Sequence, residues 1–329
     1  MNTTSNIPKD YPSSQVPANP SSIKTQIFLS HLMDPQKSGG LRVQGFFKKG
    51  GVFDEEYNEN GDLSHLPLVS VITIVYNGAK HIRQTILSVV EQSYENIEYI
   101  VIDGGSSDGT LDIIREFNHL IDYWVSEPDR GISDAFNKGI ALSTGKIIGL
   151  INADDWYSPG ALENVAKSHL LYPKSIIHGD LGFWTDEMVQ SYIFRGNDHL
   201  IPYRASMNHP TVFVPREVYE KVGLFSLKYR MAMDIDWLGR AKLHGVPFHH
   251  LETVLANMRR GGVSDQKWLV SYWESAQVRH NLNVSIGYNI FLFLQAILLT
   301  SSRKFLELFG FEWVIRFYRR KLSIGKFNF

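Results

Sequence analysis

The chain has no cysteine among its 329 residues. Disulfide bridges, thiolate nucleophiles and cysteine-ligated zinc are therefore excluded, and a reducing compartment is compatible with the composition. The sequence also lacks an excess of charge of either sign, because 33 Lys and Arg residues are balanced by 34 Asp and Glu residues. No global basic field marks a nucleic-acid-binding protein, so we expect no nucleic-acid partner.

Long apolar runs are missing as well. The stretch IGYNIFLFLQAILLTSS at residues 286–302 is shorter than the ~18–20 apolar residues that a membrane-spanning helix needs. Residues 1–22 are rich in Pro, Ser and Asn and lack the apolar core of a secretory signal, so we expect a disordered lead. Residues 23–66 are punctuated by Gly and charge, with LRVQGFF at 41–47 as a possible strand, and we interpret them as an N-terminal extension.

From Leu68 onward the sequence alternates between strand and helix patterns. LVSVITIVYN at 68–77 is an apolar, β-branched run typical of a strand that is buried on both faces. In the following segment Ile82, Ile86, Val89 and Val90 share one face at helical spacing. Further strands are expected at 97–103, 121–129 and 146–155, separated by helices at 111–120 and 131–145. Such alternation predicts parallel strands joined by right-handed crossovers.

Beyond about residue 175 the alternation loosens. Antiparallel strands are expected at 175–184 and 189–196, a strand and helix at 209–225, a helix at 234–245 and a closing strand at 246–259. The sequence therefore predicts an α/β fold, with a doubly wound and mostly parallel sheet, a mixed second half and C-terminal helices.

Polar residues follow the expected parallel strands, where ligands bind in sheets of this type. Asp154 and Asp155 end one buried strand, and adjacent carboxylates repel each other unless a cation lies between them. Mg²⁺ or Mn²⁺ with substrate phosphates would satisfy both groups. The alternative interpretation is a simple Asx turn or helix cap. Asp103 opens the Gly-rich turn DGGSSDGT, either to bind a ligand or to shape a turn in which Asp108 caps the next helix.

Taken together, VSVITIVYN, IEYIVIDGGSSDGT and SEPDRGISDAFNKGIALSTGKIIGLINADD resemble the nucleotide-sugar-binding half of family 2 glycosyltransferases, which have the GT-A fold. The branch that it most resembles is the bacterial one that builds exopolysaccharide, lipopolysaccharide and glycolipid sugars. The resemblance is good over 68–160, weaker to about 260 and absent before 66.

The resemblance implies a role for each polar strand end. Residues that would contact the nucleotide, the ribose or the donor sugar are Thr73, Tyr76, Asn77, Asp103, Arg130, Asp134, Asn137, Asn152 and Asp154. Thr73, Tyr76 and Asn77 would border the base, and Asp103 would bind it. Asn152 stands where the family has the first Asp of its Asp-x-Asp motif, so the metal ligands would be Asp154 and Asp155.

The resemblance also implies a general base at the start of a helix in the second half. RMAMDIDWLGRA matches that position, with Met233 in place of the common Glu, so Asp234 is the expected base. The alternative for Asp234 is a helix N-cap. Asp236 lies about 200° away on a helix and would instead pair with Arg240 at i+4. Two further positions keep both a functional and a structural interpretation, namely His209 near an acceptor, and Arg259 or Arg260 near a diphosphate.

The pattern divides the chain into a lead (1–22), an extension (23–66), a glycosyltransferase domain (67–264) and a helical C-terminal region (265–329). Within the domain, 67–157 would bind the nucleotide-sugar and 158–264 the acceptor. Aromatic residues alternate with Arg and Lys near the C-terminus, which is typical of a helix that lies in a bilayer interface. We therefore expect peripheral contact with the cytoplasmic membrane face through 285–329; the alternative is a helical pair packed on the domain.

The function expected from the resemblance is inverting transfer of a sugar from a nucleotide-diphosphate donor to a hydroxyl of a glycan or lipid-linked acceptor. A UDP-sugar is the expected donor, and the expected location is cytoplasmic, in cell-surface polysaccharide biosynthesis. Two alternatives stay open: a nucleotidyltransferase that makes nucleotide sugars, and a non-catalytic nucleotide-sugar-binding or scaffold subunit.

Overall fold

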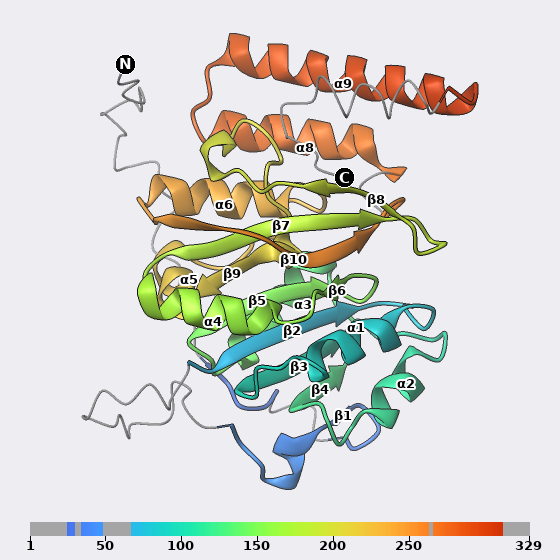
Figure 1. Ribbon diagram of the computed structural model, residues 1–329, viewed down its shortest axis with the longest axis vertical. Helices are drawn as coiled ribbons and strands as arrows, with labels where there is room; N and C mark the ends of the chain where they lie inside the picture. Colours follow the sequence, from blue (N-terminus) through green and yellow to red (C-terminus); the bar gives the residue numbers. More distant parts are fainter. Residues whose placement is uncertain (1–24, 30–33, 49–66, 263–265, 312–329) are drawn as a thin grey trace.

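The computed structural model describes residues 25–29, 34–48, 67–262 and 266–311. The expectation of disorder over 1–22 lies outside these residues. One sheet of ten strands runs through the molecule in the order β1-β4-β3-β2-β5-β9-β7-β10-β6, with β8 on β7 (Figure 1). The strands are β1 Ser38–Gly39, β2 Val69–Val75, β3 Ile97–Asp103, β4 Tyr123–Ser126, β5 Ile147–Asn152, β6 Trp156–Tyr157, β7 Ile176–Trp184, β8 Gln190–Phe194, β9 Val212–Pro215 and β10 Phe248–Arg259.

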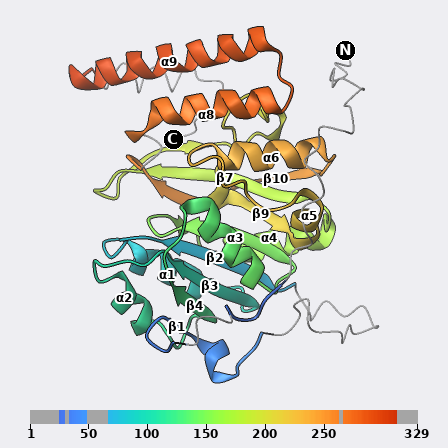
Figure 2. The same cartoon turned by 180° about the vertical axis from the view of Figure 1, so that it is seen from behind.

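Helices cover both faces of the sheet, which confirms the α/β prediction (Figures 1 and 2). They are α1 Ile82–Val90, α2 Thr110–Glu116, α3 Ile132–Leu142, α4 Ala161–Leu171, α5 Arg216–Val222, α6 Met233–Leu243, α8 Trp268–Asn281 and α9 Ile286–Leu308, with 3₁₀ turns η1 Leu41–Gln44, η2 Asp198–Leu200 and η3 His209–Thr211. Helices α1, α2 and α4 pack on one face, and α3, α5 and α6 on the other. Helix α8 lies against α6, and α9 lies outermost against α8.

The central strand β2 explains the continuous apolar run in the sequence. Its neighbours β3 and β5 are both parallel to it. Ile72 and Ile74 enter the core under α3, whereas Val69 and Val71 enter the core under α1. A strand that is buried on both faces needs apolar residues at every position, so it shows no alternation.

In the second half the sheet becomes mixed. Strand β9 lies between β5 and β7 and is antiparallel to both, and β10 is parallel to β7. Two reversals restore the original direction, so β7 and β10 run the same way as β5. The carboxyl ends of the parallel strands therefore lie at one edge of the sheet, on the right in Figure 1. These strands are β2, β3, β4, β5, β7 and β10.

The described part of the N-terminal extension packs against the sheet. Strand β1 pairs antiparallel with β4 at the sheet edge. The possible strand at 41–47 is wrong, because these residues form η1, and Gly45 ends the turn in the left-handed region at φ 87°. Arg42 of η1 is buried and donates to the carboxylate of Glu98 and to the carbonyl of Leu142. These contacts join the extension to the core.

Candidate active site

The strand registers bring the predicted polar residues to one edge. Val75 lies opposite Asp103, Asp103 opposite Ser126, and Ile74 opposite Asn152. Because these strands are parallel, the turns that follow them lie side by side. The sequence prediction that one edge collects these groups therefore has a physical basis in the register.

The turns after β2 and β3 are held together by hydrogen bonds. Asp103 is buried and accepts from the Ser106 backbone N–H at 3.1 Å and from the Ser126 hydroxyl at 2.6 Å. The Asn77 side chain accepts from the Ser107 N–H at 2.9 Å, while the Asn77 N–H donates to the Ser106 hydroxyl at 2.7 Å. Asn77 has φ 51°, a left-handed conformation that Asn tolerates better than most residues. These hydrogen bonds hold the two turns against each other.

Tyr76 and Thr73 differ sharply in access. The Tyr76 side chain is 67% exposed beside this turn, so it is available to stack on a base. Thr73 is fully buried in β2, and its hydroxyl is 3.0 Å from the Tyr99 hydroxyl. The Thr73 side chain therefore lies in the core and does not line the open edge, since an inward position in a doubly covered strand cannot reach solvent.

Arg130 and Asp134 form an ion pair at the start of α3. Arg130 donates to the Asp134 carboxylate at 2.8 Å, and that contact holds the pKa of Asp134 below its usual range. Asn137, one turn further on, donates to the Phe225 carbonyl and accepts from the Phe225 N–H, each at 2.9 Å. Its amide is thereby engaged in joining α3 to the loop after α5, which favours a structural role over contact with a donor sugar.

The acidic segment after β5 is the most electrostatically unusual part of the edge. A turn hydrogen bond runs from the Asp155 N–H to the Asn152 carbonyl at 3.2 Å, and the Thr85 hydroxyl bonds to the carbonyl of Ala153 at 2.8 Å. Asp154 is partly exposed, whereas Asp155 is 1% exposed. Burial, and next the Asp154 charge, raise the pKa of Asp155 well above its usual range; Arg259 opposes the rise.

Buried oxygens in this segment fit a divalent cation. Neither carboxylate oxygen of Asp155 forms a close hydrogen bond, although a weaker interaction with the Arg259 backbone N–H lowers the pKa of this group, and the amide oxygen of Asn152 has no partner. Carboxylate and amide oxygens are the ligands that Mg²⁺ and Mn²⁺ accept. Within the described ranges no group of three His, Asp or Glu side chains could hold a metal ion. Substrate phosphates would have to complete the coordination, as is common for Mg²⁺.

Arg259, at the end of β10, supplies a positive charge beside these acids. Its guanidinium lies 4.9 Å from the centre of the Trp156 ring and donates to the side-chain oxygen of Gln84. Burial, and next the Arg259 charge, lower the pKa of His81. Sequence reasoning left Arg259 open and missed His81, because nothing in the local pattern AKHIRQT indicates that β10 lies across from it.

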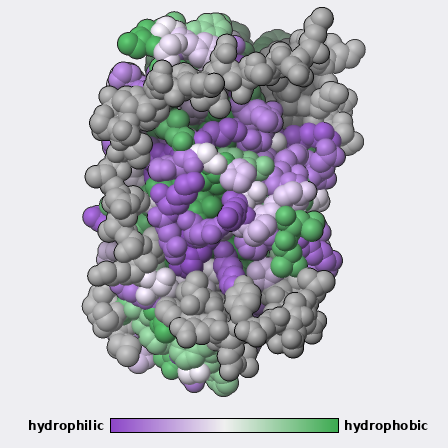
Figure 3. All heavy atoms as spheres, turned by 90° about the vertical axis from the view of Figure 1, so that its left-hand side faces the viewer, coloured by the Kyte–Doolittle hydropathy of each residue, from purple (hydrophilic) through white to green (hydrophobic). Residues whose placement is uncertain are grey.

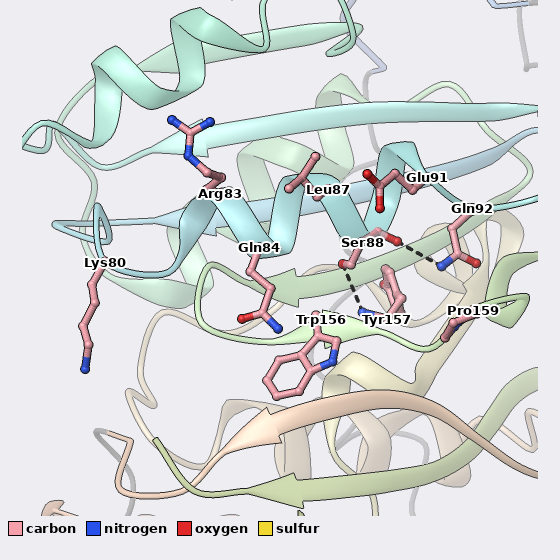
Figure 4. Close-up of a pocket in the computed structure, with 10 residues that line it drawn as sticks. All are labelled: Lys80, Arg83, Gln84, Leu87, Ser88, Glu91, Gln92, Trp156, Tyr157 and Pro159. Carbon is pink, nitrogen blue, oxygen red and sulfur yellow. Dashed lines mark hydrogen bonds between the residues drawn. The ribbon is translucent and has the colours of Figure 1, made fainter. Parts of the chain in front are cut away.

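A groove of about 670 Å³ runs along α1 beside this cluster (Figure 4). It is lined by Lys80, Arg83, Gln84, Leu87, Ser88, Glu91, Gln92, Trp156, Tyr157 and Pro159. Within it the Ser88 hydroxyl accepts from the Tyr157 N–H at 3.1 Å, and the Gln92 amide donates to the Ser88 carbonyl at 2.9 Å. None of the predicted site residues lines this groove.

Asp234 lies in the first turn of α6. It is partly exposed, and desolvation raises the pKa of its carboxyl group to about 6. It shares a small cavity of about 20 Å³ with His209 and with apolar side chains that include Trp237. Burial lowers the pKa of His209 to about 4, and its Nε2 has no partner.

The carboxylate of Asp236 accepts from Arg240 at 3.0 Å, which confirms the predicted pair.

The turn before Asp234 is held by a residue that the sequence did not single out. Glu274 of α8 accepts hydrogen bonds from the backbone N–H groups of Arg230, Met231 and Ala232 at 3.0, 2.7 and 3.1 Å. Ala232 is the N-cap position of α6 and offers no side-chain cap of its own. Glu274 therefore anchors the backbone that leads into α6, through N–H groups that precede the first turn of the helix. Only the tertiary arrangement reveals this contact, since the partners are about 40 residues apart in the chain.

Comparison with known proteins agrees with this geometry. The family model described as glycosyl transferase family 2 matches residues 70–221. A glycosyltransferase of Mycobacterium tuberculosis is 31% identical over 194 residues, which cover 55% of this chain and 71% of the relative. The chain belongs to glycosyltransferase family 2. The resemblance inferred from its motifs is confirmed, and the chain is an enzyme of the transferase class.

Two further relatives in family 2 help to place the chain. A glycosyltransferase of Rickettsia typhi is 32% identical over 201 residues, which cover 57% of this chain and 63% of the relative. The PGL/p-HBAD biosynthesis glycosyltransferase of Mycobacterium bovis is 29% identical over 185 residues, covering 52% and 68% of the two chains. The chain thus spans somewhat less than two thirds of the rickettsial protein.

Solved structures confirm the fold as GT-A. S. aureus TarS residues 1–349, in complex with UDP-GlcNAc, superimposes with a TM-score of 0.53 at 16% identity, over 70% of this chain and 71% of TarS. The mannosyltransferase PcManGT from Pyrobaculum calidifontis, in complex with GDP-Man and Mn²⁺, gives a TM-score of 0.52 at 18% identity, over 78% and 82%.

Proposed function

We propose that the chain catalyses inverting transfer of a sugar from a nucleotide-diphosphate donor to a hydroxyl group. The observation that carries the proposal is the carboxyl edge of the sheet, where Asn77, Asp103 and the acidic segment 152–155 lie in neighbouring turns. Parallel sheets bind nucleotides at that edge. Family 2 membership supports the reaction class.

For the donor we propose a UDP-sugar. Tyr76 would stack on the base. Asp103 is buried, so it would accept a hydrogen bond from the base in place of one that it now accepts from Ser106. TarS was solved with UDP-GlcNAc and PcManGT with GDP-Man. These two structural neighbours support a nucleoside diphosphate sugar as the class of donor. Arg130 and Asp134 would lie on the ribose and sugar side, where the exposed guanidinium of Arg130 is free to exchange partners.

The acidic segment would hold Mg²⁺ or Mn²⁺. We propose Asp154 and Asp155 as the carboxylate ligands, with the neutral oxygen of Asn152 beside them. A bound cation would offset the charge of the diphosphate in the donor and in the leaving group. PcManGT, whose structure contains Mn²⁺, supports a divalent metal as the class of cofactor.

Asp234 would act as the general base. The acceptor hydroxyl oxygen forms a bond to the anomeric carbon while the bond from that carbon to the diphosphate oxygen breaks. The hydroxyl proton passes to the Asp234 carboxylate, and the nucleoside diphosphate departs with the electron pair. A pKa of about 6 suits this role, because the group is mostly ionised at neutral pH and still accepts a proton well.

The acceptor that we propose is a glycan or a lipid-linked glycan of the cell surface, handled at the cytoplasmic face of the membrane. The mycobacterial PGL/p-HBAD biosynthesis relative supports a place in glycolipid or polysaccharide synthesis. The expected peripheral membrane contact of residues 285–329 belongs to the same proposal.

A donor-binding experiment tests the site first. Calorimetric titration of a panel of UDP-, GDP- and dTDP-sugars, with and without Mn²⁺, should select one nucleotide in a metal-dependent way. Asp155→Ala should weaken that binding about tenfold or more, since a buried ligand to the cation is lost. Asp186→Ala is the matched control. Asp186 is an exposed acid that pairs with Lys80.

Two results would contradict the proposed site or the proposed reaction. Metal-dependent binding that Asp155→Ala leaves intact would contradict the ligand assignment. Release of pyrophosphate from a sugar phosphate and a nucleoside triphosphate would instead indicate a nucleotidyltransferase and would contradict the proposed reaction.

A further inference from the structure

Helix α9 presents an apolar stripe to solvent. Ile286, Ile290, Leu294 and Leu298 follow one another at i+4 spacing and are 67, 54, 58 and 67% exposed. Exposed Phe291 and Phe305 lie beside them, and at 3.6 residues per turn all six fall within an arc of roughly 140°. We call these six residues the α9 stripe. A helix on the surface of a globular protein normally turns polar residues outward, so the stripe indicates a partner.

The opposite side of α9 already has its partner. The Asn289 amide donates to the Ala276 carbonyl of α8 at 2.8 Å, and Thr300 lies 2.5 Å from the Tyr272 hydroxyl. Leu292 is buried on this side. These contacts fix the rotation of α9 about its axis, so the α9 stripe points away from α8. Helix α9 lies outermost in the molecule, beyond α8 (Figure 1).

The apolar surface continues onto α8. The Trp273 ring packs against Phe293 of α9 at 6.3 Å and remains 58% exposed. Trp is well suited to a boundary between an apolar phase and water, because its ring is apolar and its N–H is polar. On the face at the left of Figure 1, hydrophilic side chains gather across the middle, and hydrophobic ones lie among them as well as toward the top and the foot (Figure 3).

Charge along the sequence indicates which partner fits. Residues 285–302 contain no charged side chain. The chain from 303 onward is basic, with Arg303, Lys304, Arg316, Arg319, Arg320, Lys321 and Lys326 against Glu307 and Glu312. Anionic lipid headgroups attract such a segment while the acyl boundary accepts apolar side chains. A second copy packed parallel to the first would instead bring two basic segments together, which is unfavourable.

We propose that α9 lies flat on an anionic bilayer, with the α9 stripe inserted at the acyl boundary. No helix in the described part of the chain is long and apolar enough to cross a membrane, which favours this parallel orientation. The proposal rests on the membrane contact proposed above for residues 285–329 and deepens it, and it does not depend on which donor or acceptor is correct. It assigns the outer surface of α9, rather than the sheet edge, to the membrane.

Vesicle co-sedimentation of the full chain tests the proposal. The protein should bind phosphatidylcholine vesicles that contain phosphatidylglycerol, bind pure phosphatidylcholine vesicles less, and lose affinity as salt is raised. The double substitution Leu294→Glu and Leu298→Glu should reduce binding about tenfold or more, because two exposed aliphatic side chains that would insert into the bilayer become charged. Leu171→Glu on α4 is the matched control, since Leu171 is 75% exposed but far along the chain from α9.

Thermal unfolding and donor binding of each variant check that the fold persists. Equal vesicle binding by the double variant and the wild type would overturn the proposal, as would failure of the wild type to bind anionic vesicles. Sedimentation equilibrium adds a further discrimination: a dimer that the same two substitutions dissociate would assign the α9 stripe to a second copy instead.

Discussion

At the scale of single residues, two carboxyl groups have raised pKa values for different reasons. Asp155 is almost fully buried and has an acidic neighbour, so both burial and like charge disfavour its ionised form. Asp234 has no such neighbour, and desolvation alone raises its pKa to about 6. Carboxyl groups with raised pKa values are frequent at functional sites, because a cation or a substrate is needed to make the charge favourable.

The rate of transfer should follow the ionisation of Asp234. Because a general base must be ionised, the rate should rise with pH up to about 6 and level off above it. Asp234→Asn should lower kcat by about 10²–10⁴-fold with little change in donor affinity. Initial rates across the pH range for wild type and variant measure both effects. Asp236→Asn is the control, and it should keep the pH profile because Asp236 pairs with Arg240.

Asp234→Asn, which should lower kcat, should by contrast make the folded protein more stable. The pKa of Asp234 is raised from 3.8, so the folded state holds the proton more tightly than the unfolded state. Protonation of Asp234 therefore stabilises the folded state. This stabilisation is complete below the unfolded pKa of 3.8 and is lost as the pH rises through about 6. Asp234→Asn should therefore raise the free energy of unfolding by about 1–3 kcal/mol near neutral pH and change it little at acid pH.

Urea unfolding of the two proteins at both pH values measures this difference. If the variant is less stable than the wild type at neutral pH, the raised pKa of Asp234 is contradicted.

At the scale of elements, α8 connects the start of α6 to the outer helix α9. Glu274 accepts from three consecutive backbone N–H groups that precede Asp234, and Gly239 of α6 approaches Leu282 so closely that a Cβ would lie 2.3 Å from its Cδ1. The position of the proposed base is thus set by α8 as well as by α6. This arrangement links the second half of the domain to the C-terminal helices.

Removal of the Glu274 carboxylate tests that link. Glu274→Ala leaves three N–H groups without their acceptor, so we expect a loss of about 1–3 kcal/mol in stability. We also expect a lower kcat, because the turn that carries Asp234 loses its anchor. Glu274→Gln keeps an acceptor oxygen and should restore much of both. Glu252→Ala, at an exposed position on β10, is the control. An unchanged kcat in Glu274→Ala would refute the positioning role.

At the scale of the whole molecule, a buried ion pair ties the N-terminal extension to the sheet. Arg42 and Glu98 are each 2% exposed at the side chain, and Glu98 also accepts from the Ser70 hydroxyl at 2.5 Å and the Thr144 N–H at 2.6 Å. Arg42 reaches the Leu142 carbonyl at the end of α3. The described extension residues are therefore part of the folded unit.

Breaking this pair should destabilise the protein strongly. Arg42→Ala leaves the Glu98 carboxylate buried without its cation, so the free energy of unfolding should fall by about 3–5 kcal/mol. The matched control is Arg83→Ala, which breaks an exposed pair with Glu116 and should cost at most about 1 kcal/mol. Denaturant unfolding of the two variants measures how far each lowers the free energy of unfolding. Equal decreases would show that burial of the Arg42–Glu98 pair adds nothing to its contribution to stability.

The sequence by itself determined the parallel half of the fold and the edge where the site lies. Strand β2 is apolar at every position and α1 has apolar residues at helical spacing, and both patterns arise from contacts with the two cores. Motifs in the order of family 2 then named Asp103, Asp154, Asp155 and Asp234, because their chemistry is tied to short local patterns. The site roles of these residues stay predictions.

Only the tertiary structure decided which of those side chains reach the edge. Thr73 faces the core, Asn137 is engaged by Phe225, and Arg259 and His81 come together from opposite ends of the domain. Glu274 and the outward direction of the α9 stripe likewise depend on α8. Periodicity is a local property of the chain, whereas burial, pKa values and long-range hydrogen bonds depend on what packs against each residue.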